Sequence, residues 1–98
     1  MKIRRLVFDE HNRRHIARHG IEEIEVRSAC GNRHIIRQAR NGRLLLLGEV
    51  LPVRRILAVV LQPMAEPGHY RVVTAHYANQ RERALFDAGS EGDTSHEH

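Results

Sequence analysis

Apolar runs of strand length dominate the middle of the chain. Four of them follow one another, over residues 33–39, 43–51, 54–62 and 69–78. A shorter run over residues 3–8 has the same character. Asn41 and Gly42 separate the first two long runs and are typical of a tight hairpin turn. The short connections favour antiparallel pairing of the four long runs in sequence order.

Two segments near the N-terminus have helical features instead. Asp9 is a good N-cap for a helix that should continue to about His19. Gly20 can end this helix because glycine accepts a positive φ after the last turn. A second helix is expected over residues 22–30, where apolar residues recur at helical spacing. These residues are Val26, Ala29 and Cys30.

A last helix is expected to open over residues 79–86, with Asn79 as its N-cap. The order is therefore two helices, a group of strands and one more helix, which predicts an α+β fold. We expect an antiparallel sheet of about four strands, joined by a short N-terminal strand and followed by a C-terminal helix.

The charge is basic and unevenly distributed. Of the 98 residues, 16 are Lys or Arg, and Lys2 is the single lysine. Residues 1–88 hold all 16 of these against nine Asp or Glu, a net charge of +7. Residues 89–98 hold three acidic residues and no Lys or Arg. We therefore expect one domain over residues 1–88 and a disordered acidic tail over residues 89–98.

The excess of arginine narrows the class of partner. Arginine binds phosphate through two parallel hydrogen bonds and keeps its charge at any working pH. A basic domain with a pI near 10.2 fits nucleic acid, an anionic membrane or an acidic protein. A basic protein without any such partner is the plain alternative.

Cys30 is the only cysteine, so no disulfide can form within the chain, which suits a reducing cytoplasm. Its place in an apolar helical stripe predicts a buried, inert thiol. The first ten residues lack the apolar region of a signal peptide, and the apolar runs are too short to span a membrane. We expect a cytoplasmic protein that makes no membrane contact.

Histidines recur at four-residue steps at positions 11, 15 and 19. Two such side chains on one helical turn can hold zinc, but each step advances about 40° around the helix, so one ion cannot use all three comfortably. His19 should border the core, about 60° from the apolar Ile16, whereas His11 should lie in water. We expect no bound metal and no cofactor.

Three blocks of the chain resemble the BrnT toxin family. "FDEHNRRHIARHGI" over residues 8–21 resembles its opening, "RLLLLG" over 43–48 one of its strands, and "YRVVTAHYANQRERALF" over 70–86 its closing strand and helix. The matching residues of the first block are Phe8, Asp9, His19, Gly20 and Ile21. Those of the last block are Arg71, Ala75, Ala78, Glu82 and Arg83. Leu44 stands where an aromatic residue is common, His76 where the family usually has arginine, and Phe86 where tyrosine is common.

The resemblance implies a compact RelE-like fold and a role as the toxin of a type II toxin–antitoxin module. It implies cleavage of RNA that halts growth. The partners would be RNA and a DNA-binding antitoxin encoded by a neighbouring gene. A dimer or a hetero-oligomer would be compatible with such a module.

RNA cleavage without a metal needs a base for the 2′-hydroxyl, cations for the transition state and an acid for the leaving oxygen. The candidate catalytic residues are Arg43, Arg71 and His76. The candidate RNA-binding residues are Arg54, Arg55, Arg81 and Arg83. Each also has a plain reading, as a solvated strand or helix position or, for His76, as a residue that caps a turn.

Strand alternation sets a condition on this site. Arg71 and His76 differ by five positions, so a regular strand would point them to opposite faces, and only a bulge or the following turn could unite them. By the same alternation, Tyr70 and Tyr77 should lie on opposite faces, with one of them in the core. Either could stack on a base. The alternative to a ribonuclease is a catalytically inactive basic module that binds nucleic acid or an antitoxin-like partner.

Overall fold

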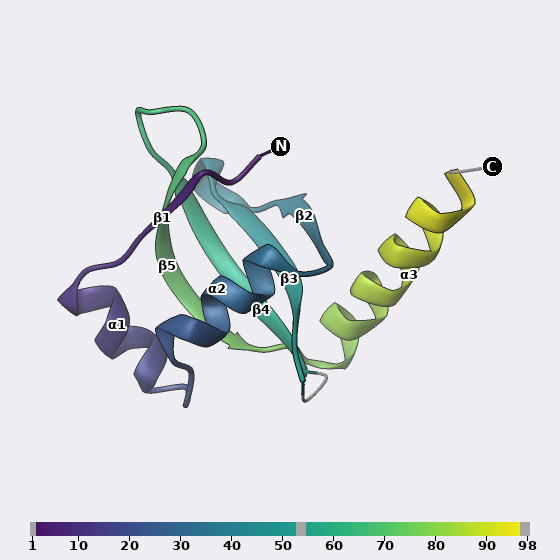
Figure 1. Cartoon of the computed structure of the whole chain (residues 1–98), viewed down its shortest axis with the longest axis horizontal. Coiled ribbons are helices and arrows are strands. Elements are labelled where there is room, and N and C mark those ends of the chain that lie inside the picture. Colours follow the sequence, from purple (N-terminus) through teal and green to yellow (C-terminus); the bar gives the residue numbers. More distant parts are fainter. Residues whose placement is uncertain (1, 53–54, 97–98) are drawn as a thin grey trace.

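The computed structural model describes residues 2–52 and 55–96, the last seven of them by their backbone alone. Five strands form one mixed sheet in the order β1-β5-β4-β3-β2. They span Arg5–Val7 (β1), His34–Gln38 (β2), Leu44–Val50 (β3), Arg55–Pro63 (β4) and His69–Tyr77 (β5). The helices span Glu10–Ala17 (α1), Glu23–Gly31 (α2) and Gln80–His96 (α3) (Figure 1). The predicted α+β fold is confirmed.

Strands β2 to β5 pair antiparallel in sequence order, as the short connections predict. The turn between β2 and β3 contains a short 3-10 segment, Arg40–Gly42. Asn41 and Gly42 both have positive φ there, 59° and 72°, which is the backbone that tight hairpin turns require. β1 lies beside β5 and runs parallel to it, so the first strand joins the sheet next to the last (Figure 1).

Each helix starts at a reciprocal cap. Asp9 accepts the Asn12 backbone N–H at 2.9 Å, and the Asn12 amide oxygen accepts the Asp9 N–H at 2.8 Å. Asn12 is fully buried and donates its amide to the Val7 carbonyl at 3.2 Å, which ties α1 to the end of β1. Asn79 and Glu82 exchange the same pair of bonds at the start of α3. Caps of this kind satisfy backbone donors that have no partner within the helix.

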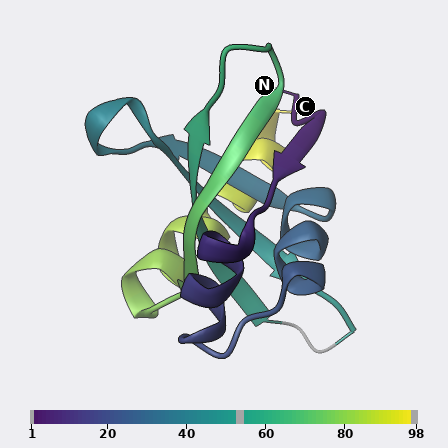
Figure 2. The same cartoon turned by 90° about the vertical axis from the view of Figure 1, so that its left-hand side faces the viewer.

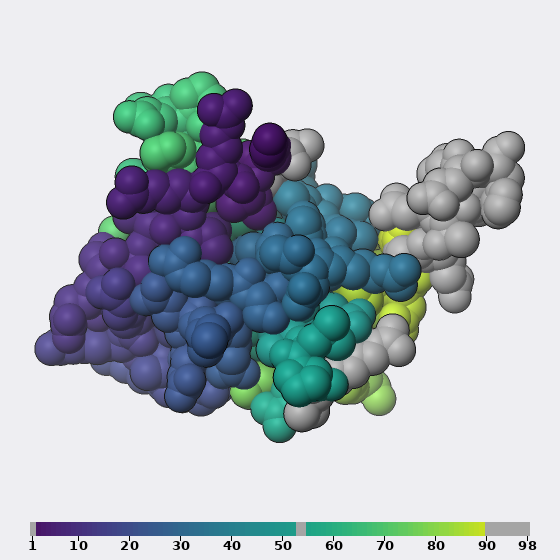
Figure 3. All heavy atoms as spheres, viewed as in Figure 1, coloured from purple at the N-terminus to yellow at the C-terminus, as the bar shows by residue number. Residues whose placement is uncertain are grey.

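The helices cover the two faces of the sheet, and Figure 2 shows α2 and α3 on opposite sides of it. The larger core lies beneath α1 and α2, where Ile16, Ile21 and Val26 pack on strand residues such as Leu46 and Val72. Figure 3 shows the N-terminal segment, α1 and α2 forming one continuous side of the molecule.

The smaller core lies beneath α3. It consists of Ile35, Leu47, Ala58 and Phe86, with Leu45 and Ile56 partly buried beside them. α3 continues to His96 and so runs through the segment that the composition predicts to be a disordered tail. In the described part of the chain, no helix combines the length and hydrophobicity needed to cross a bilayer.

Candidate functional site

A β-bulge in β5 decides where the predicted catalytic residues point. The register pairs Val60 with Thr74 and then Leu61 with Val72, so Val73 is an extra residue. Arg71 pairs with Gln62 and His76 with Ala58, four residues apart on β4, so both side chains lie on the α3 side of the sheet. A bulge therefore brings Arg71 and His76 to one face, which regular strand alternation would not do.

The arginines of this face form a row across three strands. Arg43, directly before β3, donates its Nε to the Gln62 side-chain oxygen at 3.1 Å. Arg71 is the register partner of Gln62 on the other side. The Arg71 guanidinium is hydrogen-bonded to the Asp9 carboxylate. The structure thus brings Arg43 and Arg71 to the same row and gives Arg71 an acidic partner that sequence reasoning missed.

Asp9 is held ionised by its surroundings. The hydrogen bond from the Asn12 backbone N–H is the main cause that lowers the pKa of the Asp9 carboxyl. Desolvation opposes it, and the hydrogen bond and charge of Arg71 lower the pKa further. The carboxylate caps α1 and pairs with Arg71 at once. The start of α1 and the arginine row are therefore coupled through one side chain.

His76 has a carboxylate partner as well. Its Nε2 lies 3.1 Å and 3.2 Å from the two Glu82 oxygens. Glu82 is only 15% exposed, and it also accepts the Asn79 backbone N–H at 3.0 Å. Because α3 holds Glu82 in its first turn, the imidazole is fixed at the junction of β5 and α3. The position of Glu82 three residues after the cap Asn79 is a sequence signal that could have identified it.

His76 and the arginine row are separated along the sheet. Four residues of β4 correspond to about 13 Å, and the row of Val60 and Thr74 lies between them. A substrate that meets both His76 and Arg71 must therefore run along β5. The structure places the three predicted catalytic residues on one face but does not gather them around one point.

Two of the predicted RNA-binding residues lie at the His76 end of the sheet, beside Tyr77, whose side chain faces the α1 and α2 side, opposite to His76. Arg55, Tyr77 and Arg83 line a hollow of about 290 Å³ together with Ile56 and Ala78. The Arg55 guanidinium lies 5.3 Å from the centre of the Tyr77 ring and donates to its hydroxyl at 3.1 Å.

The other two predicted RNA-binding residues are not brought to this hollow. Arg81 is exposed on α3 but does not line it, and Arg54 lies outside the described residues. The two tyrosines share one face, because the bulge shifts their alternation, so the prediction of opposite faces is wrong. The prediction that one of them is in the core is confirmed by Tyr70, which is buried while Tyr77 is exposed.

The histidine series on α1 spreads along the helix. Ring centres are 6.5 Å apart between His11 and His15 and 5.9 Å apart between His15 and His19. The described residues contain no group of three or more side chains placed to hold a metal ion. The prediction that His19 borders the core is wrong, because α1 ends at Ala17 and the chain then turns, leaving His19 exposed.

The remaining side of the molecule carries a hollow that sequence reasoning missed. It measures about 440 Å³ between β1 and α2 and is lined by Arg4, Arg5, Arg13 and Arg27. Arg13 and Arg27 both donate to the Glu23 carboxylate, at 2.8 Å and 2.9 Å, and these bonds lower the pKa of Glu23. Burial raises the pKa of the nearby Cys30 thiol to about 12, which fits the prediction of an inert thiol.

Comparison with known proteins adds no family to this picture. A scan against protein-family models finds no match for the chain, and a search of curated proteins finds no relative. Function must therefore be argued from the residues and their geometry.

Proposed function

We propose that this protein is the ribonuclease toxin of a type II toxin–antitoxin module and cleaves RNA without a metal. The observation that carries the proposal is the bulge at Val73, which sets His76 and the arginine row on one face of a basic sheet. The three sequence blocks that resemble BrnT toxins support the same reading.

His76 is the proposed general base. Its Nε2 faces Glu82, so a proton on Nε2 is held by the carboxylate and Nδ1 is left to accept a proton from substrate. In the reaction, Nδ1 takes the 2′-hydroxyl proton, the 2′-oxygen attacks the adjacent phosphorus, and the bond from phosphorus to the 5′-oxygen breaks as that oxygen takes a proton from water. The products are a 2′,3′-cyclic phosphate and a 5′-hydroxyl end.

The arginines take two roles in this proposal. Arg55 and Arg83 line the hollow beside Tyr77, the chain neighbour of His76, and they bind a phosphate of the RNA at this end of the sheet. Arg43 and Arg71 lie about 13 Å further along the sheet, where they bind the next part of the RNA strand. Tyr77 offers a half-exposed ring on which a base can stack.

The test is expression and cleavage. Inducible expression without a partner is expected to slow bacterial growth and degrade RNA, and a His76→Ala variant is expected to do neither. The purified protein is expected to leave 2′,3′-cyclic phosphate ends and to keep its activity in EDTA. Loss of cleavage in EDTA, restored by one divalent ion, would instead point to a metal held by the α1 histidines.

A second candidate function rests on a specific observation. Arg71 is paired with Asp9, and His76 is paired with Glu82, so each predicted catalytic side chain also has a structural partner. A basic module that binds nucleic acid or an antitoxin-like partner without cleaving fits these contacts. Soluble protein that binds RNA but leaves both RNA and growth intact would establish this alternative.

A further inference from the structure

Among the described strands, β2 forms one edge of the sheet and pairs only with β3. Two backbone hydrogen bonds fix which of its groups face that partner: Glu49 N–H to the Arg33 carbonyl at 3.0 Å, and Ala39 N–H to the Arg43 carbonyl at 2.9 Å. In an antiparallel pair such residues alternate with residues that face away. The N–H and C=O groups that face outward are therefore those of His34, Ile36 and Gln38.

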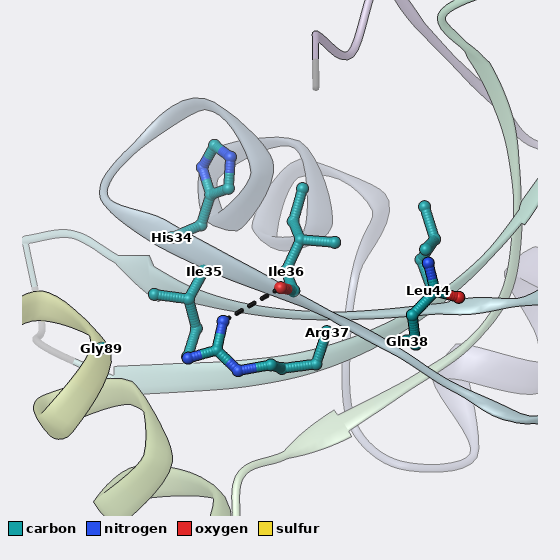
Figure 4. Close-up of a pocket in the computed structure, with 7 residues that line it drawn as sticks. All are labelled: His34, Ile35, Ile36, Arg37, Gln38, Leu44 and Gly89. Atoms are coloured by element: carbon teal, nitrogen blue, oxygen red, sulfur yellow. Dashed lines mark hydrogen bonds between the residues drawn. The ribbon is translucent and has the colours of Figure 1, made fainter. Parts of the chain in front are cut away.

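A hollow of about 490 Å³ runs along this edge (Figure 4). Five consecutive residues of β2 line it, together with Leu44 of β3 and Gly89 of α3. In Figure 4, β2 crosses the view as an extended strand, and Gly89 lies on the helix beyond the Ile35 end. The hollow therefore has the length of a short strand and exposes a row of backbone groups at strand spacing.

Over residues 33–48, the hairpin of β2 and β3 that forms this edge carries charge of one sign. Residues 33–48 include no Asp or Glu. They do include the basic residues Arg33, His34, Arg37, Arg40 and Arg43. Arg33, Arg37 and Arg40 are exposed. The nearest described carboxylate in the chain, Glu49, lies at the start of the edge and is half-buried.

We propose that the β2 edge is the docking site for an extended, acidic segment of a partner protein, which adds to the sheet as a sixth strand. Backbone groups that alternate at strand spacing match a polypeptide, whereas RNA presents no such alternation. A second copy of this chain would set one arginine cluster against another. The inference is independent of whether the protein cleaves RNA.

Arg37 explains why the docking segment must carry acidic residues. Its guanidinium folds back along the strand and donates to the Ile36 carbonyl at 3.1 Å, which shields one of the outward-facing acceptors (Figure 4). A charged side chain on an edge strand protects it against unspecific pairing. A carboxylate on the incoming segment binds the guanidinium and releases the Ile36 carbonyl for a backbone N–H. Neutral or basic segments leave this shield in place.

The experiment uses isotope-labelled full-length protein and a capped synthetic peptide of about nine residues, the length of a long strand. The peptide alternates glutamate and valine, and a control peptide of the same length alternates lysine and valine. Titration by the acidic peptide is expected to shift the amide signals of His34, Ile36 and Gln38 most. The lysine peptide is expected to shift none of them. Absence of binding by the acidic peptide at millimolar concentration overturns the proposal, as does binding centred on another surface.

Two variants separate charge from backbone pairing. Arg37→Glu is expected to weaken the acidic peptide about tenfold, a typical cost of one reversed interface charge. The matched control Arg18→Glu changes an exposed arginine directly after α1 and is expected to have no effect. Gln38→Pro removes one outward-facing N–H without touching a bond to β3, and it should also weaken binding. If Arg37→Glu and Arg18→Glu weaken peptide binding equally, the net charge of the protein explains the effect. That result would contradict a docking site at the β2 edge.

The other occupants are distinguished in the same samples. A single-stranded RNA oligonucleotide that shifts the same three amides more strongly than the peptide would assign the edge to nucleic acid. A protein that sediments as a dimer, with these amides protected from exchange, would assign it to a second copy. Either result overturns the proposal of an acidic protein partner.

Discussion

Arg71 and His76 point to the same face of the sheet although five positions separate them on one strand. The bulge at Val73 supplies the extra residue that changes the alternation between them. The face that results carries an imidazole held by Glu82 at one end and an arginine row at the other. This arrangement leads to the predictions below.

Removal of the imidazole tests its role as the base. His76→Ala is expected to lower cleavage about 10²–10⁴-fold. A base must be neutral, so cleavage by the parent should fall toward acid pH. His76→Arg is expected to be inactive, since arginine does not accept a proton at these pH values.

Two results would contradict the base role. Retained activity in His76→Arg, with a parent profile that rises toward acid pH, would assign His76 as a cation. A His76→Ala variant that cleaves like the parent at every pH would leave it as a turn residue. The measurement is single-turnover cleavage of a labelled oligonucleotide.

Neutralising the arginine row should change how RNA affinity depends on salt. In the His76→Ala background, where RNA stays intact, Arg71→Ala is expected to weaken binding and to reduce the slope of log K against log salt by about 0.7 per lost phosphate contact. Arg43→Ala should act in the same direction. Fluorescence anisotropy over a salt series measures the slope. Arg18→Ala, which changes an arginine directly after α1, should leave the slope unchanged.

The Asp9 carboxylate should make the stability depend on acid pH. Its pKa is lowered in the folded protein, so its contribution is present above the unfolded value of about 3.9 and is lost as the pH falls through the folded value. Asp9→Asn keeps a good helix cap but removes the charge beside Arg71. We expect this variant to lose stability at neutral pH and to show a flatter decline below about pH 4. Urea midpoints at several pH values measure both effects.

Gly48 should not accept a side chain. A Cβ atom built there would lie 2.1 Å from the Ala29 carbonyl oxygen, because α2 packs directly on β3 at this point. Gly48→Ala is expected to cost about 1–3 kcal/mol, or more, of the free energy of unfolding. Gly31→Ala is the matched control, since nothing lies within 4 Å of the added atom at the end of α2. Similar stability of the two variants would contradict the close contact.

Replacing Phe86 by tyrosine, the residue common at this position in BrnT toxins, should not raise the activity. Its side chain is fully buried under α3 with Ile35 and Leu47, on the inner side of the helix. Phe86→Tyr would bury a hydroxyl group and is expected to destabilise the protein by about 1–3 kcal/mol. It is also expected to leave the cleavage rate unchanged. A gain in cleavage would mean that the hydroxyl reaches the substrate.

The local pattern of residues was sufficient to predict the helices and strands and their order along the chain. The apolar runs predict four strands whose ends lie within one or two residues of the observed ones. Asp9 and Asn79 cap the helices, and Asn41 and Gly42 turn the hairpin, as their side chains and backbone preferences predict. Such features depend on neighbours in the chain, so the sequence by itself determined them.

Other features depend on residues far apart in the chain. β1 pairs with β5, and the Arg71 guanidinium meets an Asp9 carboxylate that lies 62 positions away. His19 leaves the core because the chain turns after Ala17, and Tyr70 and Tyr77 share a face because of the bulge. Beyond a bulge, the face to which a side chain points depends on how the strand pairs with its neighbour. The alternation of residues within one strand does not reveal that pairing. The candidate site was therefore decided by tertiary pairing, although each of its side chains could be named from the sequence.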